Sequence, residues 1–399
     1  MPMCPPFVAA AISQSTVLNN QIQLGDVLAN QTLDVIDVSG STSLVTAATA
    51  NTFGGSVVGG GSAAVTSTQS LQANVSTNAL MTVAHSAGDL TVLSTATTGN
   101  SGEANIFDGG TLTGTTTQTV GAFGVTAIGD FQGVLATAGD ISSSVQAIAN
   151  SQGYGVEGST SVVTLNQTSA ALTQADGGGN VQYTPGSILF SALATSNNLT
   201  ATGTYGSAVT VTANQVMTGT RTQAAVYAGT GNAQEINAQA TTVGNNISAN
   251  NTGNYLEVNA TQNNASYVRS EANLTSFEFG AATASAYGVG NSLLAGNIGH
   301  EIVLNNTQVN SGGGVEVIAG FTGDTGYDAY VTATAIGNAA TGFACASCDG
   351  RMTVHNSQTN SAEVGAFSGA QITTSGRSVT GLSAATGNSA SFYVTSPTQ

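Results

Sequence analysis

The chain has 399 residues, of which 41% are hydrophobic but only 6% are charged, whereas roughly a quarter of residues are charged in an ordinary globular domain. Four arginines, no lysine and twenty acidic residues give a net charge of −16. This charge would repel a phosphate backbone and therefore excludes a nucleic acid-binding protein. Uncharged amide and hydroxyl side chains must provide most of the solubility.

The first thirteen residues, "MPMCPPFVAAAIS", are apolar and end in small side chains. They resemble the rear part of a secretory signal, although the basic start of such a signal is missing. We therefore predict that residues 1–13 are the remnant of a secretory signal and that residues 14–399 form a single exported repeat domain. An ordinary apolar N-terminus is the alternative. No apolar stretch reaches the roughly 18 residues that a membrane-spanning helix needs.

Two polar motifs recur along the remaining chain with the same spacing. The first motif ends in a glutamine at intervals of 46 to 50 residues, and its glutamines are Gln21, Gln69, Gln118, Gln167, Gln215, Gln262, Gln308 and Gln358. The second motif ends in an asparagine at intervals in the same range, and its asparagines are Asn51, Asn100, Asn150, Asn197, Asn245, Asn291, Asn338 and Asn388. A regular period of this length is typical of a solenoid, a propeller or another repeat array.

Each motif ends a segment in which apolar and mostly polar residues alternate, as in "EIVLNNTQ" before Gln308. This period of two indicates a β-strand. In the first motif, large apolar residues such as Leu304 lie on one face of the strand. In the second motif, alanines such as Ala333 lie on the apolar face of that strand. In a parallel solenoid, equivalent residues lie roughly 4.8 Å apart, so we expect the glutamines to form a hydrogen-bonded ladder that satisfies their amides.

These patterns predict an all-β fold, a parallel β-solenoid (β-helix) built from eight repeats of about 48 residues. The alternatives are an eight-bladed propeller and a stack of β-sandwiches. The propeller fits less well because the Asn-Gly hairpin turns that would join its antiparallel strands are absent. The two motifs lie 17 to 20 residues apart and then about 30, which favours two unequal coils in each repeat, with one wide coil as the alternative.

The sharpest short motif is "CASC", which contains Cys345 and Cys348. A structural zinc site needs four ligands, and the nearest histidine, His355, would add only a third. In an exported chain these two cysteines are a candidate disulfide that closes a small loop. Free or redox-active thiols and a metal site are the alternatives. We therefore predict no cofactor.

Three pairs of carboxylates are candidates for catalytic groups or calcium ligands. Asp324 and Asp328 are the best calcium candidate, although a plain acidic turn is the favoured interpretation. Each of the three pairs lies in a different repeat. They are Asp34 with Asp37, Glu103 with Asp108, and Asp324 with Asp328. Because none of these pairs converges with a second pair in the sequence pattern, we predict no catalytic residues. The aromatic residues beside glycines pack in the core or, alternatively, form platforms for sugars.

Amide-terminated strands, two amide columns, few charges and an apparent leader are similar to features of exported curli-type surface proteins. Through phrases such as "VLNNTQVN" and "ASCDGRM", the whole chain resembles the family of holdfast anchor proteins D of stalked alphaproteobacteria. The resemblance implies an amyloid-like protein of the cell surface, associated with the outer membrane, that ties an adhesive polysaccharide to the cell. It also implies other anchor proteins and a curli-type secretion pore as partners.

We therefore expect a non-enzymatic structural adhesin whose repeated amides and hydroxyls bind the adhesive polysaccharide. The alternatives are a polysaccharide-degrading β-helix enzyme and another surface-recognition module, such as an ice-binding protein. Because an uncapped solenoid presents open strand edges, we also expect end-to-end self-association or association with partner anchor proteins.

Overall fold

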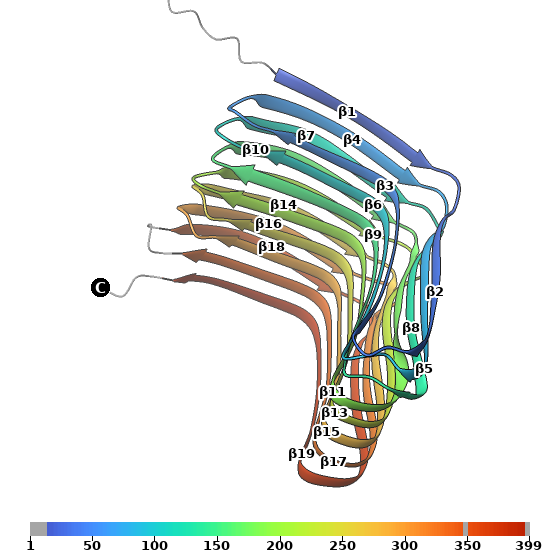
Figure 1. Cartoon of the computed structure of the whole chain (residues 1–399). Helices are drawn as coiled ribbons and strands as arrows, with labels where there is room; N and C mark the ends of the chain where they lie inside the picture. The colour runs from blue at the N-terminus through green and yellow to red at the C-terminus, as the bar shows by residue number, and fades with distance from the viewer. Residues whose placement is uncertain (1–13, 346–349, 396–399) are drawn as a thin grey trace, which may run out of the picture.

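The computed structural model describes residues 14–345 and 350–395, which form a parallel β-solenoid (Figure 1). The predicted fold class is confirmed. One strand of ten residues from each repeat contributes to a sheet of eight parallel strands, called here the short-strand sheet. Its strands are β1 (Gln14–Gln23), β4 (Ser62–Leu71), β7 (Thr111–Val120), β10 (Thr160–Ser169), β12 (Ala208–Met217), β14 (Tyr255–Asn264), β16 (Glu301–Asn310) and β18 (Arg351–Asn360).

The rest of each repeat runs out along an arm, turns at its tip and returns. In the first three repeats the outgoing strands β2 (Val27–Asp37), β5 (Val75–Ser86) and β8 (Gly124–Thr137) are separate from the returning strands β3 (Ser41–Val57), β6 (Leu90–Ile106) and β9 (Asp140–Glu157). In the later repeats both halves form one strand that bends at the tip: β11 (Leu172–Thr204), β13 (Arg221–Asn251), β15 (Tyr267–Asn297), β17 (Val315–Cys345) and β19 (Val364–Thr395).

One repeat makes one wide coil. The short strand β1 pairs with β4, so that Gln21 lies beside Gln69 in the next repeat. Both polar motifs belong to the same coil, because Gln21 Nε2 donates to the carbonyl oxygen of Thr52 at 2.7 Å. The expectation of two coils in each repeat is therefore wrong. The segment between the two motifs runs out and back and packs on itself, instead of making a second coil.

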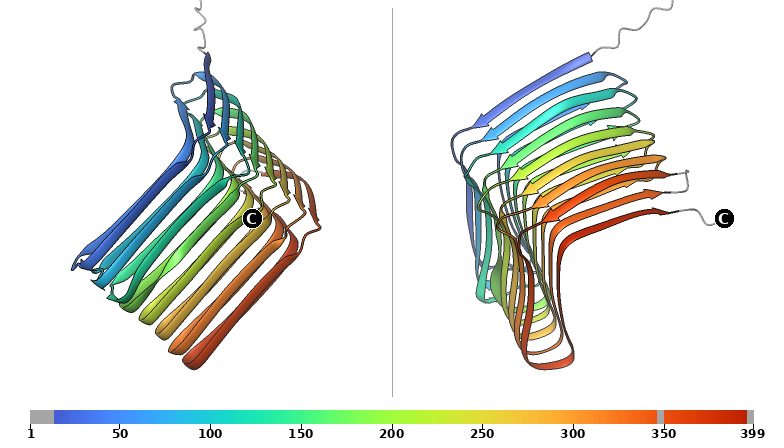
Figure 2. Two further views of the ribbon diagram at one scale, coloured as in Figure 1. Left: turned by 90° about the vertical axis from the view of Figure 1, so that its right-hand side faces the viewer. Right: turned by 180° about the vertical axis from the view of Figure 1, so that it is seen from behind.

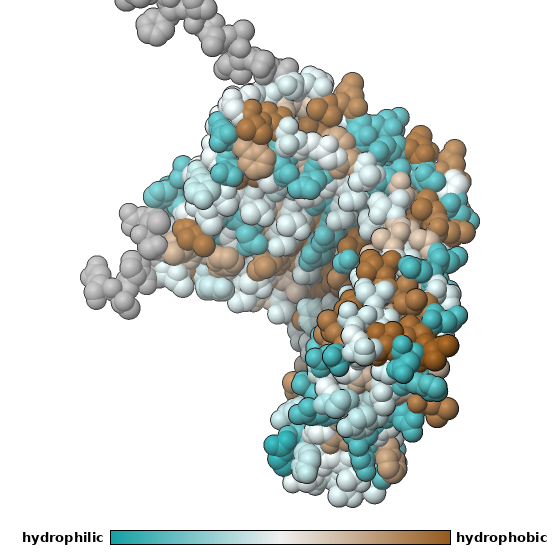
Figure 3. All heavy atoms as spheres, viewed as in Figure 1, coloured by the Kyte–Doolittle hydropathy of each residue, from teal (hydrophilic) through white to brown (hydrophobic). Residues whose placement is uncertain are grey.

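The coils have an L-shaped outline (Figure 1). One limb, called here the head, consists of the short-strand sheet and the final halves of the returning strands, and the other limb is the arm. Figure 3 shows the angle between the limbs as a hollow on one side of the molecule. The coils stack side by side along one axis (Figure 2), with the first coil (residues 14–57) and the last coil (residues 351–395) at opposite ends.

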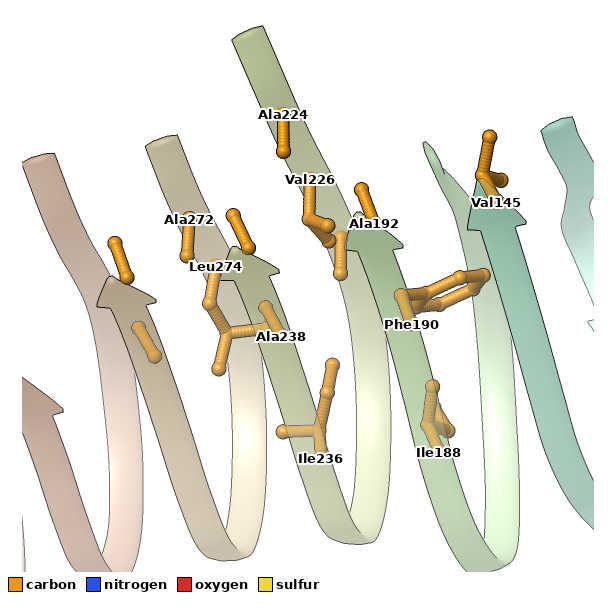
Figure 4. Close-up of a cluster of buried hydrophobic side chains, with 14 of the residues drawn as sticks. Val145, Ile188, Phe190, Ala192, Ala224, Val226, Ile236, Ala238, Ala272 and Leu274 are labelled. Carbon is orange, nitrogen blue, oxygen red and sulfur yellow. The ribbon is translucent and has the colours of Figure 1, made fainter. Parts of the chain in front are cut away.

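The core fills both limbs, and the large and small faces of the two motifs do not meet: Leu304 of the glutamine motif packs in the head, whereas Ala333 of the asparagine motif packs in the arm. In the arm, outgoing residues such as Val226 face returning residues such as Ile236 and Phe190 (Figure 4). In the head, Leu165 of the short-strand sheet packs in one cluster with Leu199 of a returning strand. Alanines occupy many of the remaining inward positions, which lets the two layers of the arm approach closely.

The described ranges contain strands, turns and bends but no helix, so no helix there could span a membrane. The predicted secretory remnant, residues 1–13, lies outside the described residues.

Candidate functional site

All eight predicted glutamines lie in one column inside the head. Each Nε2 from Gln69 onward donates to Oε1 of the glutamine in the preceding coil, at 2.7 to 2.9 Å. The same nitrogen also donates to a backbone carbonyl of the returning strand in its own coil, as from Gln308 to Ala339 at 2.9 Å. The six glutamines from Gln69 to Gln308 have no exposed surface. Each of these buried amides is therefore paired, as a stable interior requires.

The asparagines of the second motif form a parallel column at the bend of the returning strands. From Asn51 to Asn338, each Nδ2 donates to Oδ1 of the asparagine in the following coil, for example from Asn245 to Asn291 at 2.8 Å. It also donates to a carbonyl of the following short strand, as from Asn245 to Asn263 at 3.1 Å. The glutamine column therefore donates toward the first coil, whereas the asparagine column donates toward the last coil. Together they bind each coil to both of its neighbours.

Two further rows of polar side chains stand on the outer face of the short-strand sheet. They border a trough of about 460 Å³ that crosses β12, β14, β16 and β18. The strand register aligns each row along the axis. One row is Thr212, Asn259, Asn305 and His355, and the other is Asn214, Thr261, Thr307 and Ser357. We call this surface the outer trough.

Hydrogen bonds hold part of the outer trough in place. Asn305 Nδ2 donates to Asn259 Oδ1 at 2.8 Å, and His355 Nδ1 lies 3.1 Å from Asn305 Oδ1. Because Asn305 Oδ1 can only accept, this contact requires a proton on His355 Nδ1. Thr261, Thr307 and Ser357 are exposed, and none of their hydroxyls has a hydrogen bond within the described residues. The trough thus combines ordered amides with hydroxyls that are open to a ligand.

A second groove, of about 530 Å³, crosses the tip of the arm. Residues from β11, β13, β15, β17 and β19 line this tip groove, including Tyr183, Asn232, Phe279 and Tyr327. Phe279 is buried and packs edge-on against Phe321, with ring centroids 5.0 Å apart. Phe279 therefore packs in the core, whereas Tyr327 is 57% exposed.

Charged residues near the tip and on the arm form local pairs. Arg377 lies 5.3 Å from the centre of the Tyr327 ring and 2.8 Å from the Asp328 carboxylate. On the outer face of the arm, Arg269 contacts Glu271 at 2.8 Å and Glu316 at 3.4 Å. Burial, together with the hydrogen bond that its hydroxyl donates to Glu316, raises the pKa of Tyr267 to about 12. These contacts connect neighbouring strands and provide a structural role for Arg269 and Arg377.

Several of the other candidate carboxylates are held by local hydrogen bonds or ion pairs. Glu103 accepts a hydrogen bond from Asn105 at 2.7 Å, and Asp34 accepts one from Thr82. Asp328, one of the two calcium candidates, is held by Arg377 and by Ser378 Oγ at 2.8 Å. Within residues 14–345 and 350–395, no group of three or more His, Cys, Asp and Glu side chains is placed to hold a metal ion.

One of the two cysteines of the candidate disulfide lies outside the described residues. Cys345 is the last residue of β17, but Cys348 lies outside the described residues. Sequence reasoning also missed the outer trough and the tip groove. A signal for the trough was available, because its rows lie at fixed distances before each glutamine of the column. No comparable signal marks the tip, where each repeat has a different sequence.

An acidic all-β solenoid with amide columns inside and polar rows outside defines a class of repeat protein that offers the same contacts again and again along one axis. Comparison with known families narrows this class. The family model of holdfast attachment protein D matches residues 36–314, which is more than half of the chain, and the chain therefore belongs to this family. This membership implies a function in holdfast attachment and suggests a location at the cell surface. Searches of curated proteins and of solved structures find no significant match.

Proposed function

We propose that this protein is a non-enzymatic structural adhesin that anchors an extracellular adhesive polysaccharide to the outer membrane, with the polymer lying along the outer trough. The observation that carries the proposal is the pair of polar rows that border the trough across four successive coils. Family membership supports the attachment role. Export, an amyloid-like state and association with other anchor proteins and a curli-type secretion pore belong to the same proposal.

The chemistry of the trough favours an uncharged or amino-bearing sugar chain. Threonine hydroxyls and asparagine amides both donate to and accept from sugar hydroxyls, and each hydrogen bond contributes about 1 kcal/mol net. A polymer that repeats along the axis can form the same weak contact on each coil, so that its affinity grows with length. The net charge of −16 disfavours a polyanionic sugar.

The test removes three hydroxyls while keeping the shape of the strands. Val replaces Thr212, Thr261 and Thr307 together, and binding is measured on acetylated and deacetylated amino-sugar oligomers and on polysaccharide purified from holdfasts. Loss of three hydrogen bonds at about 1 kcal/mol each predicts an affinity loss of roughly 100-fold. The control is Thr200→Val with Thr202→Val, which lie on the outward face of a returning strand, away from the trough.

Unchanged affinity in the triple variant would show that the polymer does not bind along the outer trough. New reducing ends during incubation of the purified parent protein with the polymers would contradict its non-enzymatic part and favour a polysaccharide-degrading enzyme.

A further inference from the structure

Among residues 14–345 and 350–395, the first and the last coil each leave part of the hydrophobic core exposed at one end of the solenoid. In the part of the chain that the structure describes, the apolar side chains that border the core yet stay partly exposed all belong to the first or the last coil. They are Val17, Val27, Ala29, Leu33, Val35, Ala50, Phe53 and Val57 at one end, and Met352, Val354, Val364, Ala366, Ile372 and Phe392 at the other. A repeat protein usually covers such faces with polar capping repeats.

The two end faces share one strand register in the head and along much of the arm. The short strands β1 and β18 both have ten residues, and unbroken register connects Val27 to Val364 through the successive outgoing strands. The returning strands keep the same register from Asn51 to Asn388. At these positions the first coil could therefore continue the stack beyond the last one. The arm tips differ, because β2 and β3 are separate strands whereas β19 is continuous, and register shifts interrupt the pairs near the tip.

The amide columns give this match a direction. At the start of the glutamine column, Gln21 Nε2 donates to Thr52 but has no glutamine before it. At its end, Gln358 Oε1 accepts no hydrogen bond from the described residues. The asparagine column is arranged in the opposite way. Asn51 Oδ1 has no donor within those residues, and Asn388 Nδ2 has only a long contact to Gln358 O at 3.5 Å.

Charge favours the same pairing of unlike ends. The first coil contains Asp26, Asp34 and Asp37 and no basic residue, whereas the last coil contains Arg351, Arg377 and a single acidic residue, Glu363. The formal charges are thus −3 for the first coil and, from two arginines less one glutamate, +1 for the last. Two first coils facing each other would repel, and a first coil facing a last coil would attract.

We propose that the last coil of one molecule binds the first coil of a second copy, so that both sheets and both amide columns continue across the junction. Asn388 Nδ2 then donates to Asn51 Oδ1 of the second copy, and Gln21 Nε2 of the second copy donates to Gln358 Oε1. The reversed arrangement, with two like ends in contact, would place donor against donor and acceptor against acceptor. Assembly is therefore head-to-tail, and each filament has one direction.

Two asparagine substitutions separate assembly from folding. Asn388→Asp keeps the oxygen that accepts from Asn338 Nδ2 at 2.7 Å within the molecule, but it replaces the donor that faces the second copy with a carboxylate. We expect an unchanged unfolding midpoint and at least a tenfold weaker association. Asn51→Asp removes the donor to Asn100 Oδ1 at 2.8 Å and to Ser70 O at 3.1 Å, but keeps an acceptor for Asn388. We expect a lower unfolding midpoint with association retained.

The measurement uses the full chain over a range of concentrations, with sedimentation velocity for association and electron microscopy for the assemblies. Eight coils at about 4.8 Å each give an expected axial repeat of about 38 Å along a filament. A parent protein that stays monomeric at all concentrations would overturn the proposal. Equal association of the parent and Asn388→Asp would overturn it as well, and so would filaments whose two ends are equivalent.

Discussion

The amide nitrogen of Gln308 donates to the amide oxygen of Gln262 at 2.7 Å, and neither side chain has any exposed surface. The Gln308 nitrogen also donates to the Ala339 carbonyl at 2.9 Å, while its oxygen accepts from Gln358 at 2.7 Å. The Gln308 amide nitrogen thus makes two hydrogen bonds, and its oxygen accepts one, all with neighbouring residues. A carboxylate of the same size could not replace this amide, because it has no hydrogen to donate to Gln262 Oε1 and to the Ala339 carbonyl oxygen.

Replacing Gln308 with Glu is therefore expected to destabilise the protein strongly. The variant loses two donated hydrogen bonds and buries a charge, which costs about 3 kcal/mol or more. Desolvation raises the pKa of such a buried glutamate above its unfolded value of about 4.3. The part of the penalty that comes from ionisation is therefore absent below the unfolded pKa and grows as the pH rises. The loss of one donated hydrogen bond remains in acid, because a protonated carboxyl has only one O–H donor. Denaturant midpoints at pH 7 and in mild acid should show a smaller loss in acid.

The matched control is Gln371→Glu, at an exposed position outside the column. Surface substitutions usually change stability by less than about 0.5 kcal/mol. Equal effects of the two substitutions at both pH values would show that the glutamine column does not stabilise the interior.

Tyr154 is expected to make the protein sensitive to alkali. Its side chain is buried in the head and its hydroxyl lies 2.9 Å from Thr116 Oγ1. Burial raises its pKa from 10.0 to about 12, partly offset by this hydrogen bond. Stability from this group is complete below pH 10 and is lost as the pH rises toward 12. The loss is about 2–3 kcal/mol, from 1.36 kcal/mol for each pKa unit.

Tyr154→Phe should cost about 1 kcal/mol at neutral pH, because the Thr116 hydroxyl loses its partner. The same variant should lose less stability than the parent between pH 9 and pH 11, as measured by denaturant midpoints. Tyr205→Phe, at a residue that is 79% exposed, serves as the control. Parallel pH profiles of the parent and Tyr154→Phe would contradict this account.

The turn before β16 requires glycine at residue 299. A Cβ atom there would lie 1.5 Å from the Gly253 carbonyl oxygen in the turn of the preceding coil. Because the obstacle is backbone, the turns of neighbouring coils must separate to admit an alanine. We expect Gly299→Ala to lower stability by about 2 kcal/mol or more. Gly369→Ala is the control, since a Cβ there meets nothing within 4 Å, and it should be neutral or slightly stabilising. Similar melting temperatures for the two variants would contradict the close approach.

The tip groove and the outer trough predict different effects on polysaccharide binding. If the polymer lies along the outer trough, Tyr327→Ala removes an exposed aromatic ring at the tip and leaves affinity within about twofold of the parent. A stacking contact at an exposed ring would instead contribute about 0.5–1.5 kcal/mol, which corresponds to a loss of up to about tenfold. Titration of the same oligomers with Tyr327→Ala and with the triple threonine variant decides between the two surfaces.

Sequence periodicity was sufficient to predict the solenoid and to identify the residues of the glutamine column. The alternation of Ile302 and Leu304 with polar residues defines an inward face, and a column of amides follows from stacking equal repeats. Both inferences depend only on residues that are near in sequence or equivalent between repeats. The structure places these residues where such stacking requires.

The arm was not predictable in the same way. Its tip lies at Thr184–Pro185–Gly186 in one repeat but at Gln234 and Glu235 in the next, so no common turn sequence marks the reversal. In the later repeats the bend occurs within strands of 31 to 33 residues. Packing of Phe190 and Ile236 against the outgoing layer determines the reversal, and such packing cannot be read from the spacing of motifs.

The opposite donor directions of the two amide columns also have an electrostatic consequence. Each column is a line of side-chain dipoles arranged head to tail, and such lines add to a large moment when they all point the same way. Here eight glutamines point one way and eight asparagines the other, so the two moments largely cancel. Adding coils therefore builds up little axial field. A structure of this kind can grow in length without an axial dipole from its amide columns that increases with each repeat.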